Sequence, residues 1–189
     1  MRTLRPAALL FLAIVLSSGQ EPAVPVELQY NLMIKVLTFD RNLRSRVGTE
    51  IVIGIPYQKS VCESVAAKDA LLKVIRTSGP SPWDDLPVRA VAFELDDPND
   101  LDEIFGREGI DILYIPPLRA FDVRAIVPVC NARRVLSFTG LPDYLKAGVS
   151  IGFDLKEERP EILVNLVSAR LAGADFSSKL LRLVRVVEE

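Results

Sequence analysis

The stretch EIVIGI, residues Glu50–Ile55, stands directly before Pro56 and determines the expected fold of this chain. Four of its six residues are β-branched, and Glu50 is its only polar residue. A short, continuous apolar run of this kind is typical of a strand that is covered on both faces, as the strands of parallel sheets are. We therefore predict that residues 50–55 form the first strand of a parallel sheet and that the strand ends at Pro56.

Further apolar runs follow along the chain, and helical patterns separate them. The predicted strands after the first are Val88–Leu95, Asp111–Ile115 and Arg134–Thr139. The predicted helices cover residues 27–39, Lys59–Ile75, Leu101–Phe105 and Arg119–Cys130, the last of them broken by Pro128. Strands and helices that alternate in this way predict βαβ units with right-handed crossovers and a sheet that is covered on both faces.

The pattern changes after Gly140. The β-type runs Val149–Leu155 and Glu161–Leu166 predict an antiparallel hairpin, and helices are predicted at Val167–Ala172 and Ser177–Val187. The last helix has a wide apolar face, which either packs on the sheet or forms an exposed docking surface. The predicted fold class is α/β, a three-layer α/β/α sandwich with a mostly parallel sheet and a C-terminal antiparallel hairpin.

The N-terminus has the composition of a secretory signal. Two arginines precede the uncharged apolar run Ala7–Leu16, and small residues follow it up to Gly19. The run is shorter than the roughly 20 apolar residues that a membrane-spanning helix needs. We predict that residues 1–19 are a signal peptide cleaved near Gly19 and that residues 20–189 form a single domain.

The composition argues against several classes of function. The chain has 23 Lys and Arg against 25 Asp and Glu, so it lacks the positive field that nucleic-acid binding needs. It has no His, which removes His-based nucleophiles, general bases and zinc sites. The turn after the first strand, IGIPYQKS, lacks the glycine spacing of phosphate-binding loops. We therefore predict no catalytic, cofactor-binding or metal-binding residues, no cofactor, no nucleic-acid partner and no enzymatic activity.

Any small ligand is expected beyond the carboxyl ends of the strands, where ligands of open α/β sheets bind. One acidic cluster lies there and could coordinate a divalent cation or provide paired carboxylates. Its residues are Asp96, Asp97, Asp100, Asp102 and Glu103. An acidic loop that precedes a helix also suits the helix dipole without any ligand, and this is the interpretation we favour.

The two cysteines, Cys62 and Cys130, have two interpretations. Export to an oxidising compartment would allow them to form a disulfide, which would contribute on the order of 4 kcal/mol for so long a loop. Alternatively, they are two separately buried thiols that behave as small apolar residues. The sequence leaves both interpretations open.

The C-terminal segment ILVNLVSARLAGADFSSKLLRLVRVV, residues Ile162–Val187, carries a resemblance to a known family. Its order of strand, Asn, Ala-rich helix, Gly turn, Ser pair and Leu-rich helix resembles the C-terminal signature of the YfiR-like periplasmic proteins. Residues Leu28–Phe39 and Ile51–Ile55 look like the family's opening helix and first strand. The signature residues of structural type are Asn165, Gly173, Ser177, Ser178, Leu180 and Leu181.

The resemblance implies a small periplasmic α/β protein that acts by binding another protein. The best-known member of the family represses a membrane-bound diguanylate cyclase by binding the periplasmic sensor region of that enzyme. The same role is expected here, and a homodimer is left open. The alternative is a small-ligand-binding domain that resembles one lobe of a periplasmic solute-binding protein.

Overall fold

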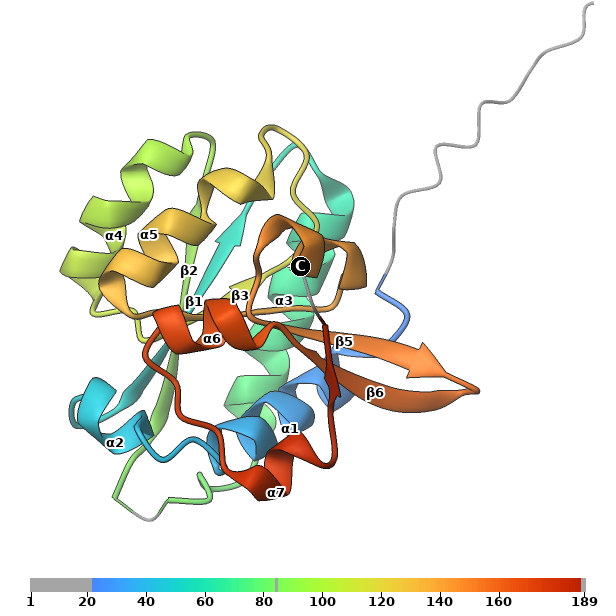
Figure 1. The fold of residues 1–189 in the computed structure, drawn as a ribbon. Helices are drawn as coiled ribbons and strands as arrows, with labels where there is room; N and C mark the ends of the chain where they lie inside the picture. Colours follow the sequence, from blue (N-terminus) through green and yellow to red (C-terminus); the bar gives the residue numbers. More distant parts are fainter. Residues whose placement is uncertain (1–21, 84, 188–189) are drawn as a thin grey trace, which may run out of the picture.

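The computed structural model describes residues 22–83 and 85–187, so the predicted signal peptide lies outside the described residues. The described residues form one seven-stranded sheet with helices on both faces (Figure 1). The strands are β1 (Ile51–Tyr57), β2 (Val88–Glu94), β3 (Ile112–Ile115), β4 (Leu136–Thr139), β5 (Ile151–Lys156), β6 (Arg159–Val164) and β7 (Arg185–Val186). The α-helices are α1 (Val26–Leu37), α2 (Leu43–Arg46), α3 (Cys62–Thr77), α4 (Leu101–Glu108), α5 (Val127–Arg133), α6 (Leu166–Leu171) and α7 (Ser178–Leu181).

The strand order across the sheet is β2-β1-β3-β4-β5-β6-β7. The neighbouring strands from β2 to β5 are parallel, whereas β5 and β6 form an antiparallel hairpin. The short β7 pairs parallel to β6 at the edge of the sheet. The prediction of a mostly parallel sheet with a C-terminal antiparallel hairpin is confirmed.

Two hydrophobic clusters lie on the two faces of this sheet. One cluster contains core residues of α1 and α3, and the other contains core residues of α4 and α5. Strand β1 contributes to both, because Ile51 and Ile53 belong to the first cluster and Val52 belongs to the second. Successive side chains of a strand point to opposite faces, so both faces of β1 are buried. This explains the continuous apolar run, and the predicted three-layer sandwich is confirmed.

The turn of the β5–β6 hairpin is shorter than the predicted connection, residues 156–160. Strand pairing continues to Lys156 and Arg159, so only Glu157 and Glu158 form the turn. Both turn residues have left-handed backbone angles, with φ of 50° and 62°. A two-residue hairpin turn of type I′ requires positive φ at both positions, so the turn geometry fixes the register of the hairpin.

The predicted C-terminal helix, Ser177–Val187, is wrong in its extent. The structure has only the single-turn helix α7, which ends at Leu181, and the chain then forms β7 beside β6. Three of the last four residues before Glu188 are valines, which strands favour. Arg185 also donates from Nε to Glu161 of β6 at 2.9 Å. Pairing with the sheet therefore overrides a helical spacing of apolar residues.

The predicted helix Arg119–Cys130 is also wrong in its start. The chain first forms a loop and a short 3-10 turn at Val123–Ala125, and the α-helix α5 begins only at Val127. Pro128 lies in the first turn of α5, where the missing N–H costs nothing, so it belongs to the start of the helix and does not break it.

Candidate functional site: an apolar C-terminal face

At the carboxyl edge of the sheet, Gln58 takes up the backbone donors that a ligand would be expected to use. The switch point of the strand order lies between β1 and β3, and Gln58 directly follows β1. Its side chain is completely buried, and Oε1 accepts the backbone N–H of Arg119 at 2.7 Å and of Ala120 at 3.2 Å. Successive backbone N–H groups of this kind can bind anions. Here an uncharged group of the chain itself satisfies them.

Other polar groups at this edge also bind within the chain. Arg119 pairs through Nη2 with Oε1 of Glu63, in the first turn of α3, at 2.9 Å. Thr139, which ends β4, donates from Oγ1 to the carbonyl of Ile115 at 2.9 Å. The exception is Nε2 of Gln58, which is buried and has no hydrogen-bond partner among the described residues. This edge is therefore held together by contacts between its own loops.

Three of the five acidic residues singled out from the sequence, Asp97, Asp102 and Glu103, cap a turn or pair with a cation. Asp97 accepts the backbone N–H of Asn99 at 2.9 Å and caps the 3-10 turn that leads into α4. Asp102 binds Arg133 of α5 through two hydrogen bonds, and Glu103 lies 3.4 Å from Arg107. Within residues 22–83 and 85–187, no three His, Cys, Asp or Glu side chains form a group that could hold a metal ion.

The structure does not bring the two cysteines together. Cys62 is an exposed free thiol at the start of α3. Cys130 is a buried free thiol in α5 and belongs to the cluster on the other face of the sheet. Burial raises the pKa of the Cys130 thiol to about 12. The sheet thus lies between two thiols of opposite exposure.

Two of the signature residues shape the ends of α6. Asn165 is buried, and its Oδ1 accepts the backbone N–H of Ser168 at 3.0 Å, which caps the N-terminus of the helix. Gly173 follows the helix with a φ of +83°, which side-chain-bearing residues rarely adopt. A Cβ at this position would also meet Cδ of Arg46 at 3.0 Å. These residues fix where α6 starts and how the chain leaves it.

Of the other four signature residues, Ser177 is the N-cap of α7 and the remaining three lie in that helix. Ser177 and Ser178 start the helix, and Ser178 is exposed. Leu180 is 1% exposed in the hydrophobic core, whereas Leu181 is only partly buried against that core. The signature therefore anchors the short helix through Leu180.

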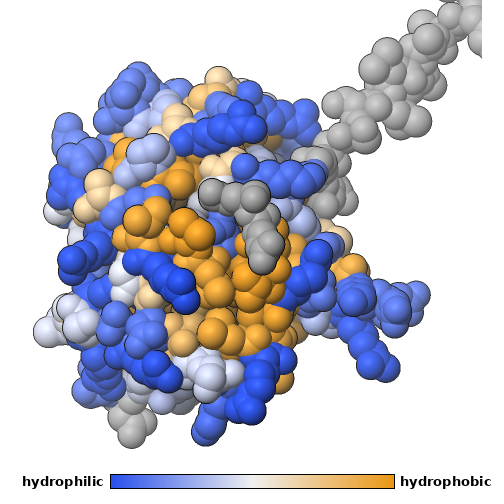
Figure 2. Space-filling model, in the orientation of Figure 1, coloured by the Kyte–Doolittle hydropathy of each residue, from blue (hydrophilic) through white to orange (hydrophobic). Residues whose placement is uncertain are grey.

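Large exposed apolar side chains gather in the C-terminal part of the chain. Val167 and Leu171 lie four residues apart on α6 and are 57% and 59% exposed. Leu183, which lies between α7 and β7, is 64% exposed, and Val186 of β7 is 41% exposed. Figure 2 shows an apolar area that extends over α6 and the β7 segment. We call these four residues the C-terminal face.

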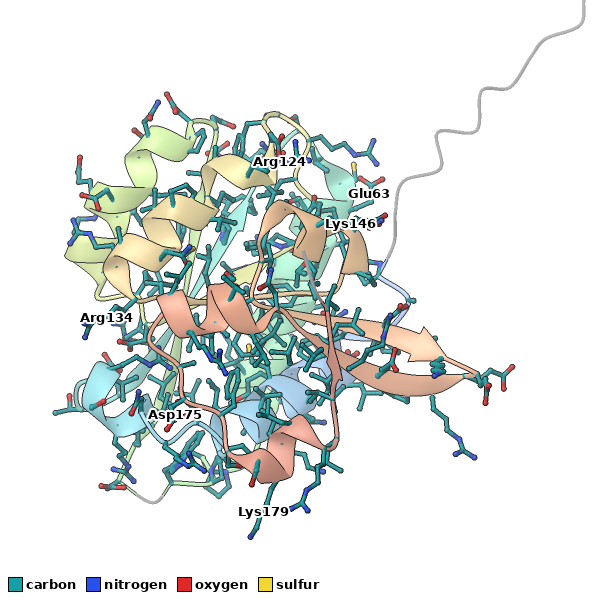
Figure 3. All side chains as sticks on the ribbon, viewed as in Figure 1. Glu63, Arg124, Arg134, Lys146, Asp175 and Lys179 are labelled. Carbon is teal, nitrogen blue, oxygen red and sulfur yellow. The ribbon has the colours of Figure 1, made fainter. Side chains whose placement is uncertain are left out.

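The charges near the C-terminal face are mostly positive. From Leu166 to Val187 the chain has four cations and one acid, Asp175. Asp175 pairs with Arg41 at 3.3 Å, whereas Arg170, Lys179 and Arg182 are exposed and form no ion pair with any described residue. The Lys179 side chain extends from α7 away from the body of the molecule (Figure 3). Three cations without an ion pair among the described residues therefore lie in the same C-terminal part of the chain as this face, although the whole protein has a net charge of -2.

A set of hydrogen bonds holds the chain between α6 and α7 against the end of α1. Arg41 donates its backbone N–H to Asp175 at 2.9 Å, and Ser177 donates its backbone N–H to Phe39 at 3.0 Å. The backbone N–H of Asp175 in turn donates to Oδ1 of Asp40 at 2.9 Å. These hydrogen bonds fix the position of the C-terminal face relative to α1, and we call residues 39–41 and 175–177 its frame. Nothing in the sequence indicated these contacts.

Comparison with known proteins identifies both a family and a fold. A sequence model described as YfiR/HmsC-like matches residues 73–185. No curated protein sequence matches the chain.

Three solved structures are similar to this one in fold. A conserved domain protein from Vibrio cholerae has 16% sequence identity and a TM-score of 0.61 over 87% of this chain and 60% of its own. The ABC domain from Streptococcus pneumoniae in complex with L-Trp has 11% identity and a TM-score of 0.60, over 86% of this chain and 62% of its own. The ligand-free, open substrate-binding protein CD0873 from Clostridium difficile has 14% identity and a TM-score of 0.54, over 78% of this chain and 57% of its own. The chain spans about three fifths of the length of these proteins, and the likeness concerns the fold.

Proposed function

Since the chain belongs to the YfiR/HmsC-like family, we propose that it is a non-enzymatic periplasmic regulator that represses a membrane-bound signalling enzyme. It acts by binding the periplasmic region of that enzyme, which we take to be a diguanylate cyclase. The family match reaches Arg185 and therefore includes α6, α7 and most of the C-terminal face.

The C-terminal face is the observation that carries this proposal. Soluble proteins rarely leave neighbouring large apolar side chains exposed without a use for them. Leu171 and Leu183 each leave about 60% of their surface in water. Completing the burial of such a side chain in a complex contributes about 1–2 kcal/mol. Two or three such contacts, on a frame that is already ordered, can hold a partner without a large entropic cost.

The charges around the face indicate the chemistry of the partner. Arg170, Lys179 and Arg182 are exposed beside the face and form no ion pair among the described residues. A complementary surface has an apolar centre with carboxylates at its rim, because charges of opposite sign at the rim fix the orientation and increase the association rate. We therefore expect an apolar segment with acidic flanks in the periplasmic region of the cyclase.

Repression requires only a difference in affinity between two states of the partner. If the regulator binds the inactive state more tightly, each tenfold difference in affinity shifts the equilibrium by about 1.4 kcal/mol. One apolar contact that is made only in the inactive state is enough for a tenfold shift. A domain without a catalytic step can therefore control the cyclase by binding alone.

The arrangement of Gln58 favours this function over a solute-binding lobe. The backbone donors of Arg119 and Ala120 at the switch point already bind the Gln58 side chain. A ligand carboxylate at this place would have to displace a buried amide. The surface of the C-terminal face is available without any rearrangement.

The test compares cyclic di-GMP in a deletion strain that is complemented with wild-type protein or with variants. Deletion is expected to raise cyclic di-GMP, and Leu171→Asp is expected to fail to restore the low level. Ala66→Asp is the matched control, because Ala66 is also an exposed apolar residue of a helix, α3, away from the C-terminal face. Full repression by Leu171→Asp, or an unchanged level after deletion, would contradict the proposal.

Export is part of the same proposal. We infer that residues 1–19 are removed near Gly19 and that residues 20–189 work as one domain in the periplasm. Within residues 22–83 and 85–187, no helix is long and apolar enough to cross a membrane. N-terminal sequencing of the protein from a periplasmic extract tests this inference, and an intact Met1 in the membrane fraction would overturn it.

A further inference from the structure

Strand β2 forms an open edge of the sheet along its whole length. It pairs with β1 in a parallel register over all seven of its residues, and no other described strand pairs with it. All residues of β3 and β4 are buried, whereas no residue of β2 is buried. The backbone of β2 therefore has a neighbour on one side only, and half of its hydrogen-bonding groups point away from the sheet.

The hydrogen bonds at the two ends of β2 show which backbone groups point outward. Leu95 donates its backbone N–H to Tyr57 at 2.9 Å, and Ile51 donates its backbone N–H to Pro87 at 2.8 Å. In a parallel pair, every second residue directs its backbone groups to the same neighbour, so residues 89, 91 and 93 bind β1. The residues that direct N–H and C=O outward, which we call the outward set, are Val88, Ala90, Ala92 and Glu94. Among the residues that the structure describes, none of these backbone groups has a hydrogen-bond partner.

β2 lacks the features that usually prevent an edge strand from pairing. Edge strands are commonly short, contain Pro or a bulge, or have Lys side chains along them. β2 contains no Pro and no Lys, and its register with β1 has no bulge. Its two charged residues are paired within the chain, Arg89 with Glu50 and Glu94 with Lys59. The uncharged centre of β2 is therefore an open template for another strand.

The side chains beside this edge indicate what kind of segment fits it. On the face that α3 covers, the partly buried apolar residues are Leu72, Ile75, Val88, Ala90 and Ala92. On the other face they are Val91 and Phe93. An extended segment beside β2 would complete the burial of both sets, so it is apolar on both faces. Because Ala90 and Ala92 are small, we expect β-branched side chains on the segment at the α3 face.

We propose that the edge of β2 binds an extended apolar segment of a second protein, which adds to the sheet as a further strand. Only another extended backbone supplies donors and acceptors at the spacing of the outward set, about 6.6 Å for every second residue. In strand addition, main-chain hydrogen bonds provide affinity, and the side chains on the two faces provide specificity. β2 and β7 lie at opposite ends of the strand order. Binding at β2 is therefore separate from contacts of the C-terminal face.

Calorimetric titration of the mature protein with a synthetic peptide tests binding. The probe has a central run of alternating Val and Ile between terminal lysines, and every second residue of the run is N-methylated, so only one edge of the peptide can pair. The control peptide is N-methylated at every residue of the run. It is more apolar but has no N–H to donate, and we expect it to bind at least tenfold more weakly than the probe. Equal binding of the two peptides, or no binding of the probe, would overturn the proposal.

Ala92→Pro tests the same edge from the side of the protein. Pro removes the outward N–H of residue 92 and none of the hydrogen bonds to β1, as Pro does where it is tolerated in edge strands. We expect the affinity for the probe to decrease at least tenfold. Ala92→Ser is the matched control, because it keeps the N–H, and its affinity is expected to stay within about threefold of the wild type. Thermal melting shows whether both variants are folded, and equal affinity of two folded variants would contradict strand addition.

Amide hydrogen exchange of the wild type, followed by NMR, locates the contact and needs no variant. In the free protein, the amides of the outward set are expected to exchange at least tenfold faster than those of Arg89, Val91 and Phe93, which bind β1. The probe is expected to slow exchange of the outward set. Protection of this set in the free protein, or binding of the probe without protection, would disprove the assignment to β2. Leu171→Asp is expected to bind the probe normally, so the loss of repression and the loss of strand addition are separate results.

Discussion

The side chains of Asp40 and Arg46 form an ion pair that is almost completely buried, with 0% and 5% of the two side chains exposed. Oδ1 of Asp40 also accepts the backbone N–H groups of Asn42 and Asp175, and Nη1 of Arg46 donates to the carbonyl of Arg134. One carboxylate therefore connects the end of α1, the start of α2 and the chain before α7. The frame of the C-terminal face depends on this pair.

Asp40→Asn is expected to destabilise the protein by about 3–5 kcal/mol, because it leaves the buried Arg46 guanidinium without its counter-charge. Urea unfolding followed by circular dichroism measures the loss. Asp175→Asn is the control, since its ion pair with Arg41 is exposed and is worth at most about 1 kcal/mol. Equal and small losses in both variants would mean that the buried pair does not hold the frame.

Leu180→Asp is expected to unfold the protein, whereas Leu183→Asp is expected to leave it folded. Leu180 is 1% exposed, and burial of an unpaired carboxylate costs several kcal/mol against a total stability of about 5–15 kcal/mol. Leu183 is 64% exposed, so a carboxylate there stays in water. Thermal melting distinguishes the two outcomes. A normal melting temperature for Leu180→Asp would show that α7 is not packed as described.

The buried strands could be predicted from the sequence because a continuous apolar run is a feature of local composition. Residues 50–55 predict a strand that is covered on both faces, and β1 has core residues on both faces. The segment after Leu181 was not predictable in the same way. Its one leucine and three valines fit a helical spacing, but the choice between helix and strand depends on β6, which lies more than 20 residues earlier in the chain. Pairing between distant segments is not visible in a local pattern.

The candidate site was only partly predictable for a similar reason. The sequence left open whether the apolar face of the predicted helix Ser177–Val187 packs on the sheet or forms an exposed docking surface, and it did not single out Val167 and Leu171 of α6. It did indicate that the signature residues around Gly173 are structural. It contained no sign that Asp40 and Arg46 would form a buried pair, since both are residues that usually lie at the surface. Gln58 was likewise not singled out, because a lone Gln after a strand has no motif. Only the fold brings Gln58 to the donors of Arg119 and Ala120.

The native protein is expected to react with thiol reagents at Cys62 only. Cys62 is exposed, whereas burial raises the pKa of Cys130 to about 12. At about pH 8 the thiolate of Cys130 is therefore only about one part in ten thousand. Titration with a chromogenic disulfide reagent is expected to give one thiol in the native state and two in urea. A Cys62→Ser variant serves as the control and should give none until it unfolds. A native count of zero in the reduced wild type would contradict the exposure of Cys62.

The pH dependence of stability is expected to change in Asp111→Asn. Burial raises the pKa of Asp111, whose Oδ2 accepts the backbone N–H of Val52 at 2.9 Å. Between the ordinary carboxyl pKa and this raised value, the folded state binds more protons than the unfolded state, so the contribution of Asp111 to stability decreases as the pH rises. Asn keeps an acceptor for Val52 and cannot ionise. The free energy of unfolding of the variant, measured relative to that of the wild type, should therefore increase as the pH rises from about 3 to about 7.

Asp85→Asn is the control of opposite sign for this experiment. In the wild type, hydrogen bonds from Arg44 lower the pKa of Asp85. The contribution of Asp85 to stability is therefore present above the ordinary carboxyl pKa and is lost as the pH falls. This variant should lose stability relative to the wild type as the pH rises from about 3 to about 7, although the exposed pair makes the change small. Urea unfolding at both pH values measures the two differences. If Asp111→Asn followed the same direction as Asp85→Asn, the buried environment of Asp111 would be disproved.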